Sequence, residues 1–256
     1  MKAIIPAAGH GTRFLPVTRV VPKEMLPIGA KPALELIVEE AKSAGADEII
    51  LVISHGKELI REYFKDDPAI RFVYQEEQKG LGHAVLMASS LIPDPSSPLL
   101  ILLGDALVAG CNAAKAMAEV SAAHGNASVI GLERVPQEKV SRYGIVKPRG
   151  GTRFGASDVV KIEDLVEKPS PEEAPSDLAI AGRYLLDAKI FDYLRTQTPG
   201  KGGEIQLTDA IRRMIAAPQP TTLNSQLLGY VYPGKRQDIG NPKGYFEALK
   251  AMGANE

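Results

Sequence analysis

The chain has 256 residues, and its 30 lysines and arginines nearly balance its 31 aspartates and glutamates, which gives a formal net charge of −1. This balance argues against a dedicated nucleic-acid or anionic-membrane surface, and no apolar run approaches the roughly 18 residues of a membrane helix. The single cysteine, Cys111, cannot form an internal disulfide. We therefore expect a cytoplasmic protein with no nucleic-acid and no membrane partner.

The first predicted strand, residues 3–5, runs directly into a glycine-rich turn. The turn contains Ala8, Gly9, Gly11 and Thr12. A side chain at either glycine would keep the backbone away from a polyphosphate, and bare backbone N–H groups at a strand end bind phosphates. We interpret this turn as a phosphate-binding loop, with a solvated surface turn as the alternative.

Residues 10–32 combine positive charge with proline. The cations of this segment outnumber its one acid and are Arg13, Arg19, Lys23 and Lys31. Prolines at 16, 22, 27 and 32 disfavour a regular helix, so we expect a fixed irregular loop laid over a ligand. The dinucleotide fingerprint and the Walker motif are both absent, because Phe14 replaces the third glycine of the former and no lysine directly follows Gly11.

Strands and helices then alternate along the chain. Apolar runs predict strands over 48–53, 70–75, 99–103 and 127–132, and apolar residues at helical spacing predict helices from Leu34 to Gly45 and over 58–64, 83–91 and 112–124. This alternation implies right-handed βαβ units, hence an α/β fold with a mostly parallel sheet.

Two polar side chains follow predicted strands, at the edge where such sheets bind ligands. The amide of Gln75 can read a pyrimidine edge with one donor and one acceptor, while the bare Gly80 leaves room for a base. Asp105 follows the most apolar strand, where an unpaired carboxylate is costly, and it is a candidate Mg²⁺ ligand. The alternatives are a polar strand end for Gln75 and a turn or capping role for Asp105.

From residue 136 the predicted strands become shorter and more charged. We expect strands near 143–146, 159–162, 178–186 and 227–232, and helices over 187–196, after a capping Thr208 and after Pro242. Gly182 inside a strand suggests the close approach of a ligand or backbone. We interpret residues 1–256 as a single domain, with a nucleotide-binding half at 1–135 and a sugar-binding half at 136–256.

Several motifs resemble those of the sugar-phosphate nucleotidyltransferases, and among them the uridylyltransferases. The most informative are Ala7-Ala8-Gly9-His10-Gly11-Thr12-Arg13 and Pro22-Lys23-Glu24-Met25-Leu26-Pro27, followed in family order by matches at 80–84, 166–169, 179–184 and 203–209. The resemblance runs from residue 3 to about residue 246. It implies a three-layer α/β/α, Rossmann-like, mixed sheet.

The resemblance also implies a reaction and a set of site residues. A uridylyl group would pass from UTP to glucose 1-phosphate by Mg²⁺-assisted in-line attack on the α-phosphorus, in a homo-oligomer. Arg13 and Lys23 would be catalytic, and Asp105 and Asp238 would bind the metal. The nucleotide-binding positions would be Ala8, Gly9, Gly11, Thr12, Gln75 and Gly80. The sugar-phosphate positions would be Gly144, Glu167, Lys168, Gly182 and Glu204.

Departures from the uridylyltransferase pattern leave the base and the sugar open. Residues 65–74 replace a longer helical insertion, Ser54-His55-Gly56-Lys57 replaces a Thr-Gly-Arg-Gly-Lys run, His10 replaces an apolar residue, and Ala106 stands where a second acid is frequent. Another base, such as that of dTTP, or another sugar 1-phosphate is the first alternative. A non-catalytic regulatory paralogue is the second, although the charged site positions are all present.

Overall fold

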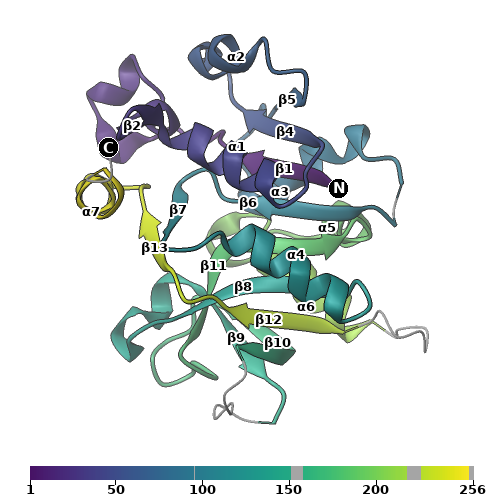
Figure 1. The fold of residues 1–256 in the computed structure, drawn as a ribbon. Helices are drawn as coiled ribbons and strands as arrows, with labels where there is room; N and C mark the ends of the chain where they lie inside the picture. The colour runs from purple at the N-terminus through teal and green to yellow at the C-terminus, as the bar shows by residue number, and fades with distance from the viewer. Residues whose placement is uncertain (95, 151–157, 218–225, 254–256) are drawn as a thin grey trace.

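A nine-stranded sheet forms the centre of the molecule, within the residues that the computed structural model describes, namely 1–94, 96–150, 158–217 and 226–253 (Figure 1). Its strands stand in the order β5-β4-β1-β6-β11-β8-β12-β10-β9. They comprise β1 (Lys2–Pro6), β4 (Glu48–Ile53), β5 (Ile70–Tyr74), β6 (Pro98–Leu102), β8 (Ser128–Arg134), β9 (Gly144–Pro148), β10 (Val159–Glu167), β11 (Leu178–Asp187) and β12 (Leu227–Val231). Two short antiparallel pairs lie outside this sheet and join β2 (Pro27–Ile28) to β3 (Lys31–Pro32) and β7 (Ala106–Ala109) to β13 (Lys235–Asp238).

The sheet is mixed, with most strands running in one direction. The strands β5, β4, β1 and β6 are mutually parallel, as are β8 and β12. In contrast, β11 runs antiparallel between β6 and β8, and β10 runs antiparallel to β12 and β9. The expected mixed, mostly parallel sheet is thereby confirmed, and the carboxyl ends of its parallel strands define the edge at which a ligand binds.

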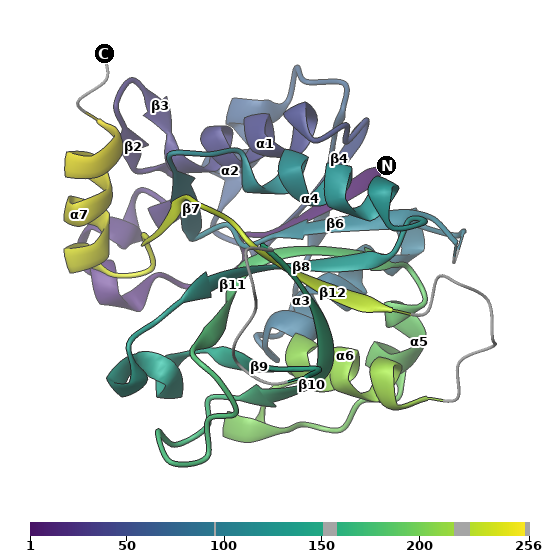
Figure 2. The same ribbon diagram turned by 60° about the horizontal axis from the view of Figure 1, so that its bottom comes forward.

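Helices cover both faces of the sheet, which gives the predicted three layers (Figure 2). One face packs on α1 (Ala33–Ser43), α2 (Glu58–Phe64), α4 (Ala113–Ala123) and α7 (Pro242–Met252), and the other on α3 (Leu81–Met87), α5 (Ile190–Arg195) and α6 (Leu207–Ala216). Successive side chains of a strand point to opposite faces, so Ile5 and Leu51 contact the first group whereas Ile4 and Ile50 contact the second. Because both faces are buried, these strands are apolar throughout.

Most predicted elements are confirmed, and three helices differ in detail. The helix predicted over 187–196 begins only at Ile190, because β11 extends to Asp187. Both β4 and α2 coincide with their predicted ranges. The helix predicted over 83–91 ends at Met87 and continues as a 3₁₀ turn, η4 (Ala88–Leu91). The predicted cap at Thr208 is wrong, because α6 begins at the buried Leu207 and Gln206 is its N-cap, so Thr208 lies inside the helix.

The proline-rich segment after β1 forms three 3₁₀ turns, as expected for an irregular loop. They are η1 (Thr12–Phe14), η2 (Val17–Arg19) and η3 (Lys23–Met25). Near the middle of the chain a further turn, η5 (Gln137–Arg142), leads into β9. None of the helices in the described residues has the length and the apolar character that crossing a bilayer requires.

Candidate active site

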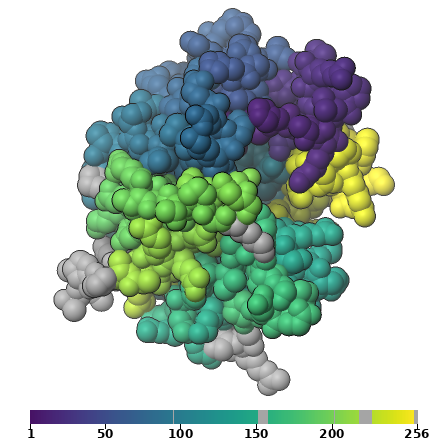
Figure 3. All heavy atoms as spheres, turned by 180° about the vertical axis from the view of Figure 1, so that it is seen from behind, coloured from purple at the N-terminus to yellow at the C-terminus, as the bar shows by residue number. Residues whose placement is uncertain are grey.

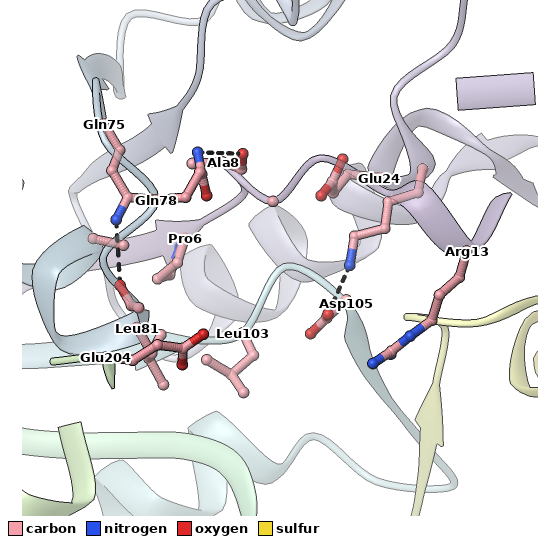
Figure 4. A pocket seen from close by; sticks show the side chains of 14 residues that line it. Pro6, Ala8, Arg13, Glu24, Gln75, Gln78, Leu81, Leu103, Asp105 and Glu204 are labelled. Atoms are coloured by element: carbon pink, nitrogen blue, oxygen red, sulfur yellow. Dashed lines mark hydrogen bonds and ion pairs between the residues drawn. The ribbon is translucent and has the colours of Figure 1, made fainter. Parts of the chain in front are cut away.

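A pocket of about 460 Å³ opens at the carboxyl ends of β1, β5 and β6, where the fold predicts a ligand (Figure 4). The predicted site residues that line it are Ala8, Gly9, Arg13, Lys23, Gln75, Gly80, Asp105 and Glu204. Other predicted residues lie outside its walls, namely Gly11, Thr12, Gly144, Glu167, Lys168, Gly182 and Asp238. Sequence reasoning missed Glu24, Gln78, Leu81 and Leu103, which also line the pocket.

The turn after β1 keeps its backbone N–H groups free. Within the described residues, the N–H groups of Ala8, Gly9, His10 and Gly11 donate to no protein acceptor. A Cβ added to Gly9 would meet no atom within 4 Å, so this glycine faces open space. Gly11 has a φ of 65°, and a Cβ there would lie 3.0 Å from the methyl group of Thr18, so the loop itself requires this glycine. Free N–H groups beside open space are the arrangement that binds phosphate.

Two cations of the loop face one carboxylate. The ammonium of Lys23 lies 2.7 Å from Oδ2 of Asp105, and the side chain of Arg13 extends toward the same carboxylate (Figure 4). Burial opposes ionisation of both Lys23 and Asp105, but their pairing outweighs it, so the pKa of Lys23 is raised and the pKa of Asp105 is lowered. Both groups therefore stay charged at neutral pH.

A buried ion pair lies behind Lys23. Nζ of Lys57 is 2.8 Å from Oε2 of Glu24, and it also donates to the carbonyl of Ala7 at 2.6 Å. Only 1% of Glu24 and 6% of Lys57 are exposed. Burial raises the pKa of Glu24 and lowers the pKa of Lys57, since it disfavours both charges. Lys57 thus joins the loop after β4 to Ala7, at the start of the phosphate-binding turn, and to Glu24 in η3. No local pattern in the sequence indicated this pair.

The predicted base-reading amide is fixed by its own neighbours. Nε2 of Gln75 donates to the carbonyl of Gly80 at 3.2 Å and to Nδ1 of His83 at 3.0 Å. Its oxygen Oε1 has no protein partner in the described part of the chain. Gly80 was expected to be bare in order to leave room for a base, and this reason needs correction. Its φ is 96°, and a Cβ at this position would lie 2.7 Å from Cβ of Glu204. This glycine makes room for the chain itself and not only for a base.

The antiparallel pairing of β7 with β13, which sequence patterns did not indicate, brings the two predicted metal carboxylates together. Asp238 pairs in register with Ala106, the residue after Asp105, and the N–H of Ile239 donates to the carbonyl of Asp105 at 2.9 Å. A Cβ added to Gly240 would lie 3.0 Å from Oδ1 of Asp238 and 3.1 Å from Oδ2 of Asp105. Both carboxylates therefore flank the same bare glycine.

The donor set around Gly240 fits a hard divalent cation that is completed by a substrate. Among the described residues, no group of three or more histidine, cysteine, aspartate or glutamate side chains comes together, so the protein alone offers no full cage. Mg²⁺ typically takes one or two carboxylates and fills its other positions with water and phosphate oxygens. Asp105 and Asp238 supply carboxylates of this kind beside the phosphate-binding turn.

A second buried ion pair holds the backbone around Asp105. Arg183, which is 0% exposed, donates from Nη2 to Oε2 of Glu40 and to the carbonyl of Ala106, at 2.7 Å each. The carbonyl of Gly182 accepts from the N–H of Leu103 at 3.0 Å on the other side of the same turn. The Asp105 turn is thus fixed from both sides, and Gly182, whose Cβ would lie 2.9 Å from the side chain of Leu103, serves this packing.

Three of the five predicted sugar-phosphate residues, Gly144, Glu167 and Lys168, lie where the start of β9 pairs with the end of β10. A Cβ added to Gly144 would lie 3.2 Å from Oε2 of Glu167 and 3.2 Å from Oγ1 of Thr208. Lys168 has a φ of 47°, in the left-handed region that side chains rarely adopt, and its N–H donates to the carbonyl of Tyr143 at 3.0 Å. Glu204 lies apart from this group, in the nucleotide-side pocket.

Comparison with known proteins agrees with this architecture. Residues 2–255 match the family model described as nucleotidyl transferase. The UTP–glucose-1-phosphate uridylyltransferase 2 of Staphylococcus saprophyticus is 42% identical, over 95% of this chain and 89% of its own length. The UTP–glucose-1-phosphate uridylyltransferase YngB of Bacillus subtilis is 40% identical, over 98% of this chain and 89% of its own length.

Solved structures agree as well. A UDP-glucose pyrophosphorylase in complex with UDP-glucose superposes with a TM-score of 0.86 at 36% identity, covering 98% of this chain and 97% of its own. A UTP-bound enzyme of the same kind from Acinetobacter baumannii superposes with a TM-score of 0.82 at 32% identity, covering 100% and 94%. Since the family model spans nearly the whole chain and the relatives are 40–42% identical over almost all of it, the chain belongs to the nucleotidyl transferase family.

Proposed function

We propose that the protein transfers the uridylyl group of UTP to glucose 1-phosphate and releases pyrophosphate, forming UDP-glucose. The two curated relatives are named for this activity, and the two structural neighbours bind UDP-glucose and UTP. The observation that carries the proposal is the pocket, in which a turn with free N–H groups, the Lys23–Asp105 pair and Gln75 face one space.

Gln75 would distinguish uracil or thymine from cytosine. Its Nε2 is occupied by Gly80 and His83, which leaves Oε1 as the acceptor available to a ligand. The N3–H of uracil can donate to this oxygen, whereas N3 of cytosine carries no hydrogen. We therefore assign the recognition of uracil to Oε1 of Gln75. The same oxygen would reject cytosine.

The phosphates of UTP would lie on the turn after β1. The attacking oxygen of a sugar 1-phosphate is already anionic at neutral pH, so the protein has to position two polyanions and offset their charge. The free N–H groups of residues 8–11 would bind the triphosphate. Arg13 would stabilise the negative charge of the reacting phosphates with the N–H groups of its guanidinium, and Lys23 would do so with its ammonium.

The metal would be Mg²⁺, held by Asp105 and Asp238. When bound, it neutralises phosphate charge and polarises phosphoryl oxygens. The lowered pKa of Asp105 keeps this carboxylate ionised for the metal. The Lys57–Glu24 and Arg183–Glu40 pairs hold Lys23 and Asp105 in place from behind.

The acceptor would bind where the start of β9 pairs with the end of β10. Lys168 would bind the phosphate of glucose 1-phosphate, and Glu167 the sugar hydroxyls, next to the bare Gly144. In this arrangement residues 1–135 would make most of the nucleotide contacts and residues 136–256 the sugar contacts, while Glu204 and Asp238 of the second half would reach the nucleotide side. The homo-oligomer and the cytoplasmic location stay predictions.

The test measures pyrophosphate release with Mg²⁺ for UTP, dTTP, ATP, CTP and GTP, each against glucose, galactose and N-acetylglucosamine 1-phosphates. Turnover confined to UTP and glucose 1-phosphate, and lost in Asp105→Ala, is the expected result. Turnover with another pair would keep the mechanism and change the substrates. Folded protein that binds UTP but releases no pyrophosphate with any pair would be a regulatory paralogue, and the proposal would fail.

A further inference from the structure

A second hollow, larger than the pocket, lies between η5, β13 and α7. Its volume is about 710 Å³, against about 460 Å³ for the pocket. In the space-filling view, an indentation separates the yellow C-terminal helix from the teal segment beneath it (Figure 3). We call this hollow the basic groove. Apart from Asp238, none of its lining residues has a role in the proposed function.

The groove is strongly cationic, although the chain as a whole carries a net charge of −1. Six cations line it against three carboxylates, Glu133, Asp238 and Glu247. Two of the cations are neutralised, since Arg236 pairs with Glu133 at 2.5 Å and Arg134 with Asp177 at 2.8 Å. The other four have no ion-pair partner in the described part of the chain and are Lys139, Arg142, Lys235 and Lys243.

The inner end of the groove reaches the predicted catalytic centre. Asp238 is one of its lining residues, and so is Tyr143, whose carbonyl accepts the N–H of Lys168 at 3.0 Å. The guanidinium of Arg236, another lining residue, lies 4.3 Å from the centre of the Tyr143 ring, in a cation–π contact. The groove therefore leads from solvent to the peptide that positions Lys168.

From this placement we infer that the basic groove is the route by which the anionic sugar 1-phosphate reaches the site, and that its four unpaired cations raise the affinity for that substrate. The four unpaired cations outnumber the two remaining carboxylates, Asp238 and Glu247, so the groove has an excess of positive charge. Such an excess focuses the field and concentrates an oppositely charged ligand, with effects on association that begin at roughly 10-fold. The nucleotide would bind in its own pocket, which shares none of the groove's lining residues. The groove acts on the acceptor alone, and the inference rests on the proposed function.

The test removes two of the unpaired cations, one from each wall. The double variant Lys139→Gln/Lys243→Gln changes exposed side chains only, so we expect it to fold like the parent. The matched control, Lys115→Gln/Lys161→Gln, removes two exposed lysines outside the groove. Steady-state kinetics are measured for each substrate at about 20 mM and about 500 mM ionic strength, where the Debye length falls from about 20 Å to about 4 Å.

At low ionic strength we expect the groove variant to raise KM for glucose 1-phosphate about 5- to 10-fold, with kcat and the KM for UTP within about twofold, because only ground-state binding is lost. The difference should vanish at high ionic strength and be absent in the control. An unchanged KM for glucose 1-phosphate would overturn the inference, as would an equal change for UTP. In the reverse direction, an increase in the KM for pyrophosphate alone would assign the groove to the other product.

Failure of the proposed function would look different. If the unaltered protein used another sugar 1-phosphate, the same measurements would be made with that acceptor. A raised KM for that acceptor in the groove variant would support the inference, and an unchanged KM would overturn it. If the unaltered protein released no pyrophosphate with any substrate pair, the proposed function itself would fall, and the groove inference with it. Activity in the unaltered protein with no kinetic change in the groove variant would overturn the groove alone.

Discussion

The nucleotide side and the sugar side of the site are assembled differently. On the nucleotide side, charged groups are held in place by buried partners, as Lys57 and Glu24 show behind Lys23. On the sugar side, Lys168 stays half-exposed and is oriented by a strained backbone bonded to Tyr143. The difference indicates that the nucleotide side is preorganised by packing and the sugar side by backbone conformation, so each should respond to a different kind of substitution.

The largest effect is expected from breaking the buried pair on the nucleotide side. Lys57→Met leaves the Glu24 carboxylate buried without its cation, which typically costs about 3–5 kcal/mol of unfolding free energy. The measurement is urea denaturation. The double variant Lys57→Met/Glu24→Leu removes both charges and should recover most of the loss, because a well-packed apolar pair avoids the desolvation cost. A double variant as unstable as Lys57→Met would show that shape, and not the unpaired charge, causes the loss.

The second prediction separates catalysis from stability at Asp105. Asp105→Asn keeps the shape but removes the charge that pairs with Lys23 and is expected to hold the metal, so kcat should fall about 100- to 1,000-fold, as for other preorganised electrostatic groups. The free energy of unfolding at neutral pH should fall by only about 1–3 kcal/mol, because the Asp105 side chain is partly exposed while the mostly buried Lys23 loses its ion-pair partner. A kcat within tenfold of the parent would exclude Asp105 as a metal ligand.

The third prediction concerns the backbone of the sugar side. A left-handed conformation costs a residue with a side chain about 1 kcal/mol relative to glycine, so Lys168→Gly should be more stable than Lys168→Ala by about that amount. Both variants lose the ammonium, and both should lose affinity for glucose 1-phosphate equally. Thermal unfolding and the KM for the acceptor check the two parts. Equal stabilities would mean that position 168 carries no strain.

The sequence predicts the framework well because its signals are local. The apolar alternation of β4 and the helical spacing of α2 each determine an element without reference to the rest of the chain. The turn after β1 and Gln75 were also predictable, since both follow strands whose carboxyl ends meet at one edge.

The rest depends on contacts between distant segments. Glu24 lies in a cationic loop, and its sequence neighbours suggest a solvated side chain. Only the fold brings Lys57, from the loop after β4, into contact with it. The pairing of β7 with β13, which brings Asp238 beside Asp105, has no local pattern in either strand. In the sequence, Arg183 is a charged residue within an apolar strand and has no evident partner. Only the fold brings it into hydrogen-bonding distance of Glu40 and of the carbonyl of Ala106. Sequence motifs of the family placed Asp238, but physical reasoning from its neighbours could not.

The smallest effect is expected on the pH dependence of base recognition. Burial and Lys79 lower the pKa of His83 below its usual 6.5, and its Nδ1 accepts a hydrogen bond from Nε2 of Gln75 while the imidazole is neutral. As the pH falls through this lowered pKa, protonation turns Nδ1 into a donor and breaks that bond, so Gln75 no longer holds Oε1 in place. Above pH 6.5 the ring is neutral and the arrangement is fully present.

Titration of UTP itself changes its affinity between pH 7.5 and 5.5. Beyond that change, we expect the affinity of the protein for UTP to fall a few-fold. This additional loss corresponds to less than about 1 kcal/mol, the contribution of one hydrogen bond. Calorimetric titration with UTP at both pH values measures this. In His83→Asn, which does not titrate in this range, only the contribution of UTP itself should remain. The same pH dependence in the variant and the parent would show that His83 does not control Gln75, and that the nucleotide side is held by its buried ion pairs alone.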